Sequence, residues 1–125
     1  DAPALQRAER LSEKASRIGF DWPDISGVKD KLQEELRELD EAVAAKDRAA
    51  MEHELGDVLF AMANLARHLG IAPEDALRGA NRRFTSRFHV VEQGLERQGI
   101  AFGEATLAQM DELWNEAKRA EKEGR

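Results

Sequence analysis

The sequence predicts an all-α protein, a bundle of about five helices around a four-helix core. Apolar residues recur at spacings of three and four along most of the chain, which is the period of a helix buried on one side. No segment alternates apolar and polar residues in the way that strands do. Charged residues make up 35% and apolar residues 42% of the sequence, a balance typical of amphipathic helices. At 125 residues, we expect one domain over residues 1–125.

The first helix is expected to run from Pro3 to about Ile18. Proline suits the first turn of a helix, and Gly19 follows as a residue that commonly ends one. A connector with two aromatic residues comes next, at residues 19–24. We expect Trp22 to anchor this connector by packing.

The second and third helices carry long apolar stripes. Ser26 is the expected cap of the second helix, whose stripe extends to Val43. Asp47 is the expected cap of the third helix, which should end at Gly70. Phe60 lies on the side opposite the stripe of this helix, so the third helix is either central or shared with a partner.

Two further helices complete the predicted bundle. Pro73 starts the fourth, which should end near Gly99. The last carries apolar residues from Leu107 to Ala117, and the charged tail at 118–125 is expected to lose helical structure.

Composition excludes several classes of function. A net charge of −6 argues against binding duplex nucleic acid, which needs a basic face. No apolar run approaches the ~20 residues that span a bilayer, and the amino terminus has no signal pattern. The absence of cysteine fits a reducing compartment, so a cytoplasmic location is expected. The chain does not begin with methionine, which suggests a piece of a longer protein.

Two pairs of carboxylates, each spaced three residues apart, are candidate metal ligands. On the second helix, Glu35 lies ~60° and Glu38 ~120° from the centre of the apolar stripe. On the third, Glu54 lies ~70° and Asp57 ~130° from the centre. If the helices pack antiparallel along their stripes, these flanks meet at one edge. Four carboxylates there would repel unless a cation neutralised them.

The expected ligand set contains only oxygen, which favours Mg²⁺, Mn²⁺ or Ca²⁺ over zinc or copper. His53 is expected to point away from the Glu54 flank, and His68 and His89 have no ligand spacing. Glu34 is the outermost carboxylate of its patch and is the candidate base for activating water. The alternative for the whole cluster is a solvated helix face on a non-enzymatic helical scaffold.

Several motifs together resemble those of one family. Glu-Glu-x-x-Glu at 34–38 and Glu-x-x-Asp at 54–57 are similar to the metal-binding signature of the MazG family of nucleoside triphosphate pyrophosphohydrolases, within the all-α pyrophosphatase superfamily. Segments 19–23, 56–67 and 81–88 also resemble family segments. The similarity runs from about Leu5 to Lys118 and is closest to the carboxy-terminal catalytic domain of two-domain members.

The resemblance implies hydrolysis of a nucleoside triphosphate to a monophosphate and pyrophosphate, with Mg²⁺ as cofactor and Mn²⁺ as a substitute. It also implies a homodimer or higher homo-oligomer and a house-cleaning or pool-control role. Related members that act on dUTP or phosphoribosyl-ATP are the rival enzymatic interpretation. The implied metal ligands are Glu35, Glu38, Glu54 and Asp57.

The resemblance further implies that Lys31, Arg83 and Arg87 contact the triphosphate and that Trp114 contacts the base, and Asn81 is a further candidate contact. Lys31 could instead form an ion pair with Glu35 one turn on, and the arginines could simply be solvated. Arg83 stands where the family commonly has lysine. Core packing is the alternative for Trp114, and Asn81 lies on the other flank of its helix from Arg83, so it is expected to reach ligand across a subunit interface.

Overall fold

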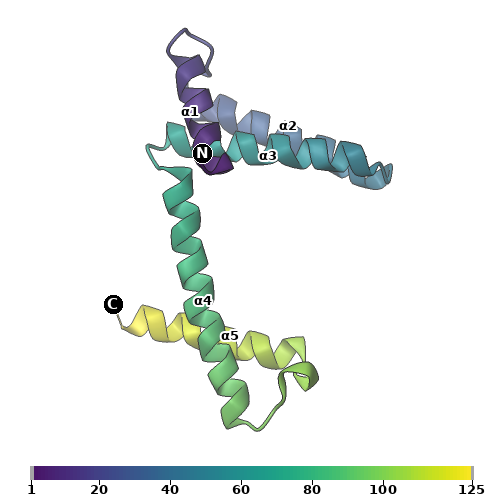
Figure 1. Ribbon diagram of the computed structural model, residues 1–125, viewed down its shortest axis with the longest axis vertical. Helices are drawn as coiled ribbons and strands as arrows, with labels where there is room; N and C mark the ends of the chain where they lie inside the picture. The colour runs from purple at the N-terminus through teal and green to yellow at the C-terminus, as the bar shows by residue number, and fades with distance from the viewer. Residues whose placement is uncertain (1, 125) are drawn as a thin grey trace. The chain divides into compact units, whose positions relative to one another are not determined.

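The computed structural model describes residues 2–124, and this part of the chain is helical without any strand. The elements are α1 (Ala4–Ser16), α2 (Ile25–Ala44), α3 (Arg48–His68), α4 (Pro73–Arg97), the short 3₁₀ helix η1 (Phe102–Glu104) and α5 (Leu107–Glu123) (Figure 1). The predicted all-α class and the number of α-helices are therefore confirmed.

The structure separates into two compact units, one up to Leu77 and one from Arg78 onward. The boundary falls within α4, and each unit is described by itself. The first unit contains α1, α2 and α3, and the second contains most of α4 together with α5. The expected single domain over residues 1–125 stays a prediction.

The starts of α2 and α3 test the predicted caps. Asp47 caps α3 as predicted, and its carboxylate accepts a hydrogen bond of 3.1 Å from the Ala50 amide. The prediction for α2 was wrong, because Asp24 rather than Ser26 is the cap and accepts a bond of 3.3 Å from the Gly27 amide. The backbone of Asp24 is extended, which lets its side chain fold back over the first turn.

The predicted end of the last helix was also wrong. α5 does not stop near Lys118 but continues to Glu123. The tail consists mainly of Lys, Arg, Glu and Ala, which are strong helix formers. At the other end, Thr106 and Gln109 form a reciprocal capping box that fixes where α5 begins.

In the first unit, α2 and α3 lie side by side and run antiparallel, joined by a short turn (Figure 1). Val28 from α2 and Ala63 from α3 are almost fully buried, at 1% and 0% exposed. Ala42, Val58 and Ala61 are buried with them. Because most of these side chains are small, the two backbones approach closely, and the flanks that carry the carboxylates meet along one seam.

The second unit has its own core, formed by Val91 and Leu95 of α4 with Leu113 of α5. Gly94 allows the close approach, since a Cβ atom there would lie 2.5 Å from a Leu113 methyl group. Arg87 adds a paired hydrogen bond to Glu121 of α5, with nitrogen–oxygen distances of 3.0 to 3.2 Å.

One carboxylate of the connector between α1 and α2 bonds to the end of α3. Asp21 lies 2.7 Å from an Arg67 nitrogen and 2.9 Å from Nε2 of His68, both near the end of α3. Arg67 also donates to Ser12 Oγ at 3.2 Å and to Asn64 Oδ1 at 2.7 Å. Through Arg67 the connector is therefore tied to α1 and α3 at once.

These contacts change the acidity of Asp21. Partial burial alone would raise its pKa, but hydrogen bonds from Arg67, His68 and the Trp22 amide outweigh that effect and lower it. The Asp21 carboxylate is therefore ionised at neutral pH and pairs with the positively charged Arg67.

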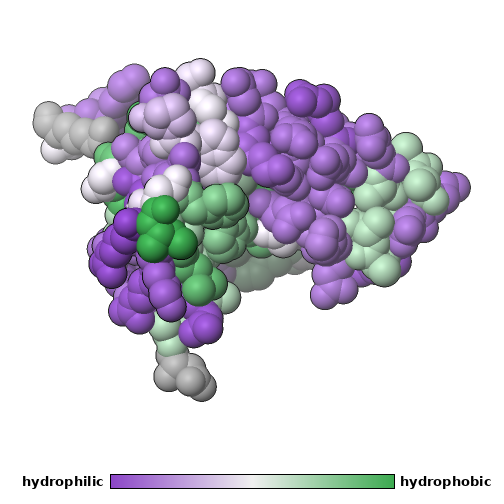
Figure 2. Space-filling model, turned by 90° about the horizontal axis from the view of Figure 1, so that it is seen from above, coloured by the Kyte–Doolittle hydropathy of each residue, from purple (hydrophilic) through white to green (hydrophobic). Residues whose placement is uncertain are grey.

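Figure 2 shows polar residues over most of the face in view, with the most hydrophobic residues left of its centre and weakly hydrophobic ones also at its right end. Among the described residues, no helix is both long and apolar enough to cross a bilayer. Large apolar side chains are nevertheless exposed on α3, namely Leu55, Leu59, Phe60 and Met62, and at its C-cap, Leu69.

We predict that Asp21 makes stability depend on acid. Its pKa is lowered by folding, so the stability that it contributes is present above its unfolded pKa, about 4, and is lost as pH falls through the folded pKa. Thermal unfolding of the wild type and Asp21→Asn between pH 7 and pH 2.5 should show a difference in Tm that narrows on acidification. A difference that stays constant would contradict the ion pair.

Candidate metal centre

Three carboxylates from two helices converge at the α2–α3 seam. Oxygens of Glu35 and Glu38 on α2 and of Glu54 on α3 all lie within 4.8 Å of one another. Asp57 belongs to a second such group, with Glu54 and His53. The structure therefore brings the four predicted ligands together around Glu54, and the acidic groups could hold a metal ion.

Two oxygens in this cluster have no hydrogen-bond partner among residues 2–124. They are Oε2 of Glu35 and Oε2 of Glu54, and both are buried. Glu35 as a whole is only 5% exposed, whereas the Asp57 side chain is 47% exposed. Glu35 and Glu54 are thus nearer the core, as their wheel positions predicted. Leaving a buried charged oxygen unpaired is costly, so the cluster suits a cation that these two atoms can reach.

Repulsion within the cluster also raises the pKa of Glu38. The largest cause is a hydrogen bond between the Glu38 and Glu54 carboxyl groups, and partial burial and the charge of Glu35 add to it. Carboxyl groups this close together disfavour a further negative charge, which a divalent cation would neutralise.

Lys31 supplies the nearest positive charge. Its Nζ lies 2.9 Å from Glu35 Oε1 and 3.6 Å from an oxygen of Glu34. The hydrogen bond to Glu35 raises the pKa of Lys31. The ion pair that the sequence left open is therefore present, and it occupies only one of the two Glu35 oxygens. The Glu34 side chain is 49% exposed, and its role as a base stays a prediction.

The prediction for His53 was wrong. Its Nε2 lies 3.3 Å from Asp57 Oδ2, and it joins Glu54 and Asp57 as a possible ligand group. Residues four apart on a helix share a face, and the long imidazole reaches along the turn to Asp57. The His53 side chain is 71% exposed, whereas in the all-oxygen group Glu35 is buried and Glu38 and Glu54 are half-buried.

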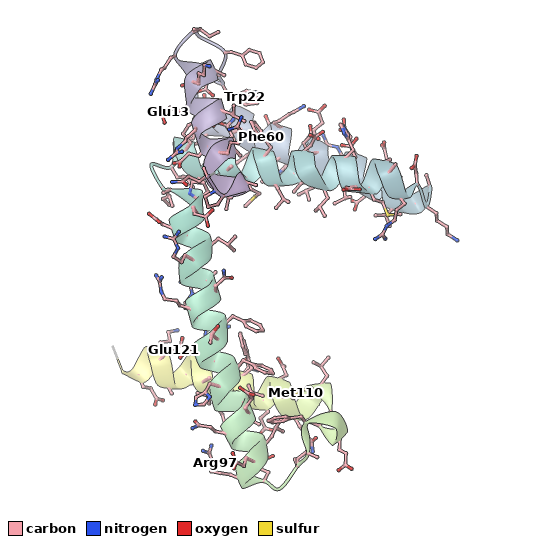
Figure 3. All side chains as sticks on the ribbon, in the orientation of Figure 1. Glu13, Trp22, Phe60, Arg97, Met110 and Glu121 are labelled. Carbon is pink, nitrogen blue, oxygen red and sulfur yellow. The ribbon has the colours of Figure 1, made fainter. Side chains whose placement is uncertain are left out.

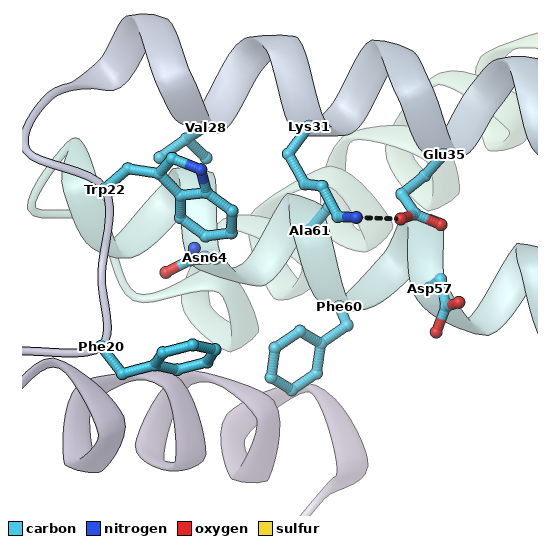
Figure 4. Close-up of a pocket in the computed structure, with 9 residues that line it drawn as sticks. All are labelled: Phe20, Trp22, Val28, Lys31, Glu35, Asp57, Phe60, Ala61 and Asn64. Carbon is cyan, nitrogen blue, oxygen red and sulfur yellow. Dashed lines mark ion pairs between the residues drawn. The ribbon is translucent and has the colours of Figure 1, made fainter.

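A cavity of about 430 Å³ opens beside the Lys31–Glu35 pair (Figure 4). Its charged end is formed by these two residues and Asp57. Its other walls come from the connector, α2 and α3, namely Phe20, Trp22, Val28, Phe60, Ala61 and Asn64. Trp22 and Phe60 face the same region of the first unit in Figure 3. The cavity joins an aromatic end to an anionic, metal-suited end.

Phe20, Phe60 and Asn64 line this cavity, although the sequence did not predict them as site residues. Phe60 was placed opposite the apolar stripe, but its function as a cavity wall depends on the connector folding over α3. Asn64 lies one turn after Phe60 and is only 4% exposed. The spacing of these two residues on one face was the available signal. Phe20 could not have been found in this way because it lies outside any helix.

The predicted contacts on α4 and α5 belong to the second unit. Arg87 is bound by Glu121, which raises the pKa of Arg87, and its guanidinium lies 5.6 Å from the Trp114 ring centre. Trp114 packs against Phe84 at 5.3 Å and against the core of that unit, so its core-packing alternative is present. Substrate contacts by Arg87 and Trp114 stay predictions.

Asn81 and Arg83 are exposed on α4. Asn81 borders a shallow depression together with Arg78, Arg82, Thr85 and Ser86. Within the described part of the second unit, the Arg83 side chain forms no hydrogen bond or ion pair. Their contacts with substrate also stay predictions.

Comparison with known proteins supports the same family. Residues 25–91 match the model of the MazG nucleotide pyrophosphohydrolase domain. The chain is 47% identical, over 116 residues, to the nucleoside triphosphate pyrophosphohydrolase/pyrophosphatase MazG of Thermotoga maritima, covering 93% of this chain and 44% of that protein. It is 41% identical to the nucleoside triphosphate pyrophosphohydrolase of Escherichia coli K12, over 95% of this chain and 46% of that protein.

The chain thus spans less than half the length of these relatives. The matched residues 25–91 include all four predicted metal ligands and the α2–α3 seam. On the match to the domain model and the extent of its identity to these relatives, the chain belongs to the MazG nucleotide pyrophosphohydrolase family.

Proposed function

We propose that this protein is a Mg²⁺-dependent pyrophosphohydrolase that converts a nucleoside triphosphate to a nucleoside monophosphate and pyrophosphate. The observation that carries the proposal is the pair of buried, unpartnered oxygens of Glu35 and Glu54 beside a cavity with aromatic walls. Family membership and the printed names of the Thermotoga and Escherichia relatives support the reaction type.

Glu35, Glu38, Glu54 and Asp57 are the proposed metal ligands. Carboxylate oxygens are hard ligands, which suit Mg²⁺ and allow Mn²⁺ to replace it. When bound, the divalent cation supplies charge neutralisation for phosphate oxygens and lowers the pKa of bound water. The unpartnered oxygens of Glu35 and Glu54 support this assignment because a bound cation would supply the partner that each of them lacks.

The chain's own residues then have separate functions. Glu34 accepts a proton from the attacking water, whose oxygen bonds to the α-phosphorus while the bond to the bridging oxygen of pyrophosphate breaks. Lys31 donates to a phosphate oxygen from the edge of the cavity. At about 430 Å³, the cavity lies in the range of ligand pockets and has room for part of a nucleoside.

Four residues after Leu77 are further proposed substrate contacts, on the family resemblance. Arg83 and Arg87 would contact the triphosphate, Trp114 the base, and Asn81 the ligand across a subunit interface. Arg87 would have to exchange its bond to Glu121 for one to a phosphate oxygen, which is also a charged acceptor.

The proposed assembly is a homodimer. Its support is the number of large apolar side chains that α3 exposes beside the metal cluster, including Leu55 at 49% and Leu59 at 53%. Apolar exposure of this extent on one helix is typical of a surface that is covered in an assembly. A dimer formed on this face would bring the carboxylate clusters of both subunits to one interface.

The biological role that we propose is house-cleaning of non-standard nucleotides or control of the nucleotide pool, in the cytoplasm. It rests on analogy with the family. The rival enzymatic proposal, a preference for dUTP or phosphoribosyl-ATP, would use the same carboxylate cluster. The non-enzymatic scaffold needs no metal at all.

Product analysis tests the proposed reaction. Incubation with Mg²⁺ and a panel of ATP, GTP, UTP, dUTP and phosphoribosyl-ATP should yield monophosphate and pyrophosphate in equal amounts. Addition of EDTA should abolish turnover. Release of diphosphate and phosphate would contradict the site of cleavage. Turnover of dUTP or phosphoribosyl-ATP alone would favour the rival enzymes, and no turnover of any substrate would favour the scaffold.

Single substitutions test the metal ligands. Glu35→Ala and Asp57→Ala should each lower turnover by about a thousandfold or more, because each removes an anionic ligand of the metal. Helical circular dichroism should be unchanged, and Mn²⁺ binding measured by calorimetry should weaken.

The matched control is Glu52→Ala, which removes an exposed carboxylate from α3 outside both ligand groups. It should retain wild-type turnover and Mn²⁺ affinity. Unchanged monophosphate formation in Glu35→Ala or Asp57→Ala would exclude the assignment of that residue.

A further inference from the structure

We propose that Asp21 is a positioning residue, which holds the Phe20–Trp22 wall of the cavity in place through its bonds to Arg67 and His68. The proposal rests on the proposed function only in assigning the cavity to substrate. The structural part, that one carboxylate fixes this wall, stands on the described contacts alone.

Asp21 lies between the two aromatic residues of the wall. Phe20 and Trp22 both line the cavity, and Asp21 lies between them in a connector without helical structure. Phe20 is 80% exposed, so packing contributes little to holding its ring. A fixed wall therefore requires a bond from the connector to a rigid element.

Asp21 makes that bond twice. Its two carboxylate oxygens contact Arg67 at 2.7 Å and His68 at 2.9 Å, and one of them also accepts the Trp22 amide at 2.8 Å. The side chains of Arg67 and His68 are only 17% and 12% exposed. Charge-assisted bonds in such partly buried places hold geometry better than exposed pairs do.

Arg67 then links the wall to α3 and α1. It donates to Oδ1 of Asn64, a cavity residue that is 4% exposed, and to Oγ of the buried Ser12 on α1. The same guanidinium therefore orients Asn64 and anchors Asp21. In Figure 4, Asn64 lies between Trp22 and Phe20, and the Phe20 ring lies beside that of Phe60.

Trp22 is also fitted against α2. A Cβ atom at Gly27 would lie 2.6 Å from the indole, so the ring packs directly on the helix backbone. This contact restricts where the indole lies once the connector is in place, but it does not hold the connector itself. The Phe20 amide also donates to the Ala15 carbonyl of α1 at 3.1 Å, so loss of the Asp21 bonds should free Trp22 more than Phe20.

Kinetics separate positioning from chemistry. The wall is remote from the carboxylate cluster, so it contributes binding that the ground state and the transition state share. We expect Asp21→Ala to raise KM about tenfold with kcat within about twofold of the wild type. Asp21→Glu keeps a carboxylate that can reach Arg67, and should recover most of the lost KM.

A second readout needs no nucleotide. In a Trp114→Phe background Trp22 is the sole tryptophan, and its acrylamide quenching reports the exposure of the wall. Trp22 is 38% exposed when held, so Asp21→Ala should raise the quenching constant about twofold as the ring becomes free. Arg67→Ala should do the same, and the double variant should add little to either change.

The matched control is Asp24→Asn, which removes a negative charge from the same connector while keeping an effective cap on α2. It should leave KM and quenching at wild-type values. Should Asp21→Ala fail to fold, Asp21→Asn supplies the same two readouts with the side-chain shape kept.

Unchanged KM and unchanged quenching in the Asp21 variants would overturn the proposal, as would a fall in kcat at constant KM. Quenching is measured without substrate, so it tests the positioning function separately. Absence of turnover in the wild-type chain would instead overturn the proposed function.

Discussion

Antiparallel packing of α2 against α3 is the constraint on which the first unit depends. Burial of Val28, Ala61 and Ala63 in that seam brings Glu35 and Glu54 inward with them. The result is two carboxylate oxygens that are buried and unpartnered. Buried polar oxygens without a hydrogen-bond partner destabilise a metal-free fold, so the packing that makes the unit also favours a cation beside them.

The cavity depends on a second, weaker set of interactions. Helix packing provides Val28, Phe60 and Asn64, but the Phe20–Trp22 wall comes from a connector that is held by polar bonds to Arg67 and His68. The metal cluster is therefore built on rigid helices, whereas one wall of the adjacent cavity can move if a single carboxylate is lost. This difference suits a site in which the reacting end must be fixed more tightly than the remote end of the ligand.

Local periodicity explains how much could be predicted from sequence. Helical geometry alone placed Glu35 and Glu54 near the core, because 100° per residue fixes the angle between each of them and the apolar stripe. The Asp21–Arg67–His68 contacts join residues more than forty positions apart, so no local pattern could reveal them. The cap at Asp24 was missed because Ser26 is an equally good capping residue two positions away, and His53 because a long side chain can reach the next turn.

The central claim is that a divalent cation binds between the buried oxygens of Glu35 and Glu54. An anomalous difference map from crystals soaked in Mn²⁺ locates the bound ion directly. We predict a peak at about 2.0–2.4 Å from Oε2 of both residues, with Lys31 still paired to the other Glu35 oxygen. Crystals soaked in millimolar Mn²⁺ with no peak at these oxygens, or with one only at exposed carboxylates, would contradict the account.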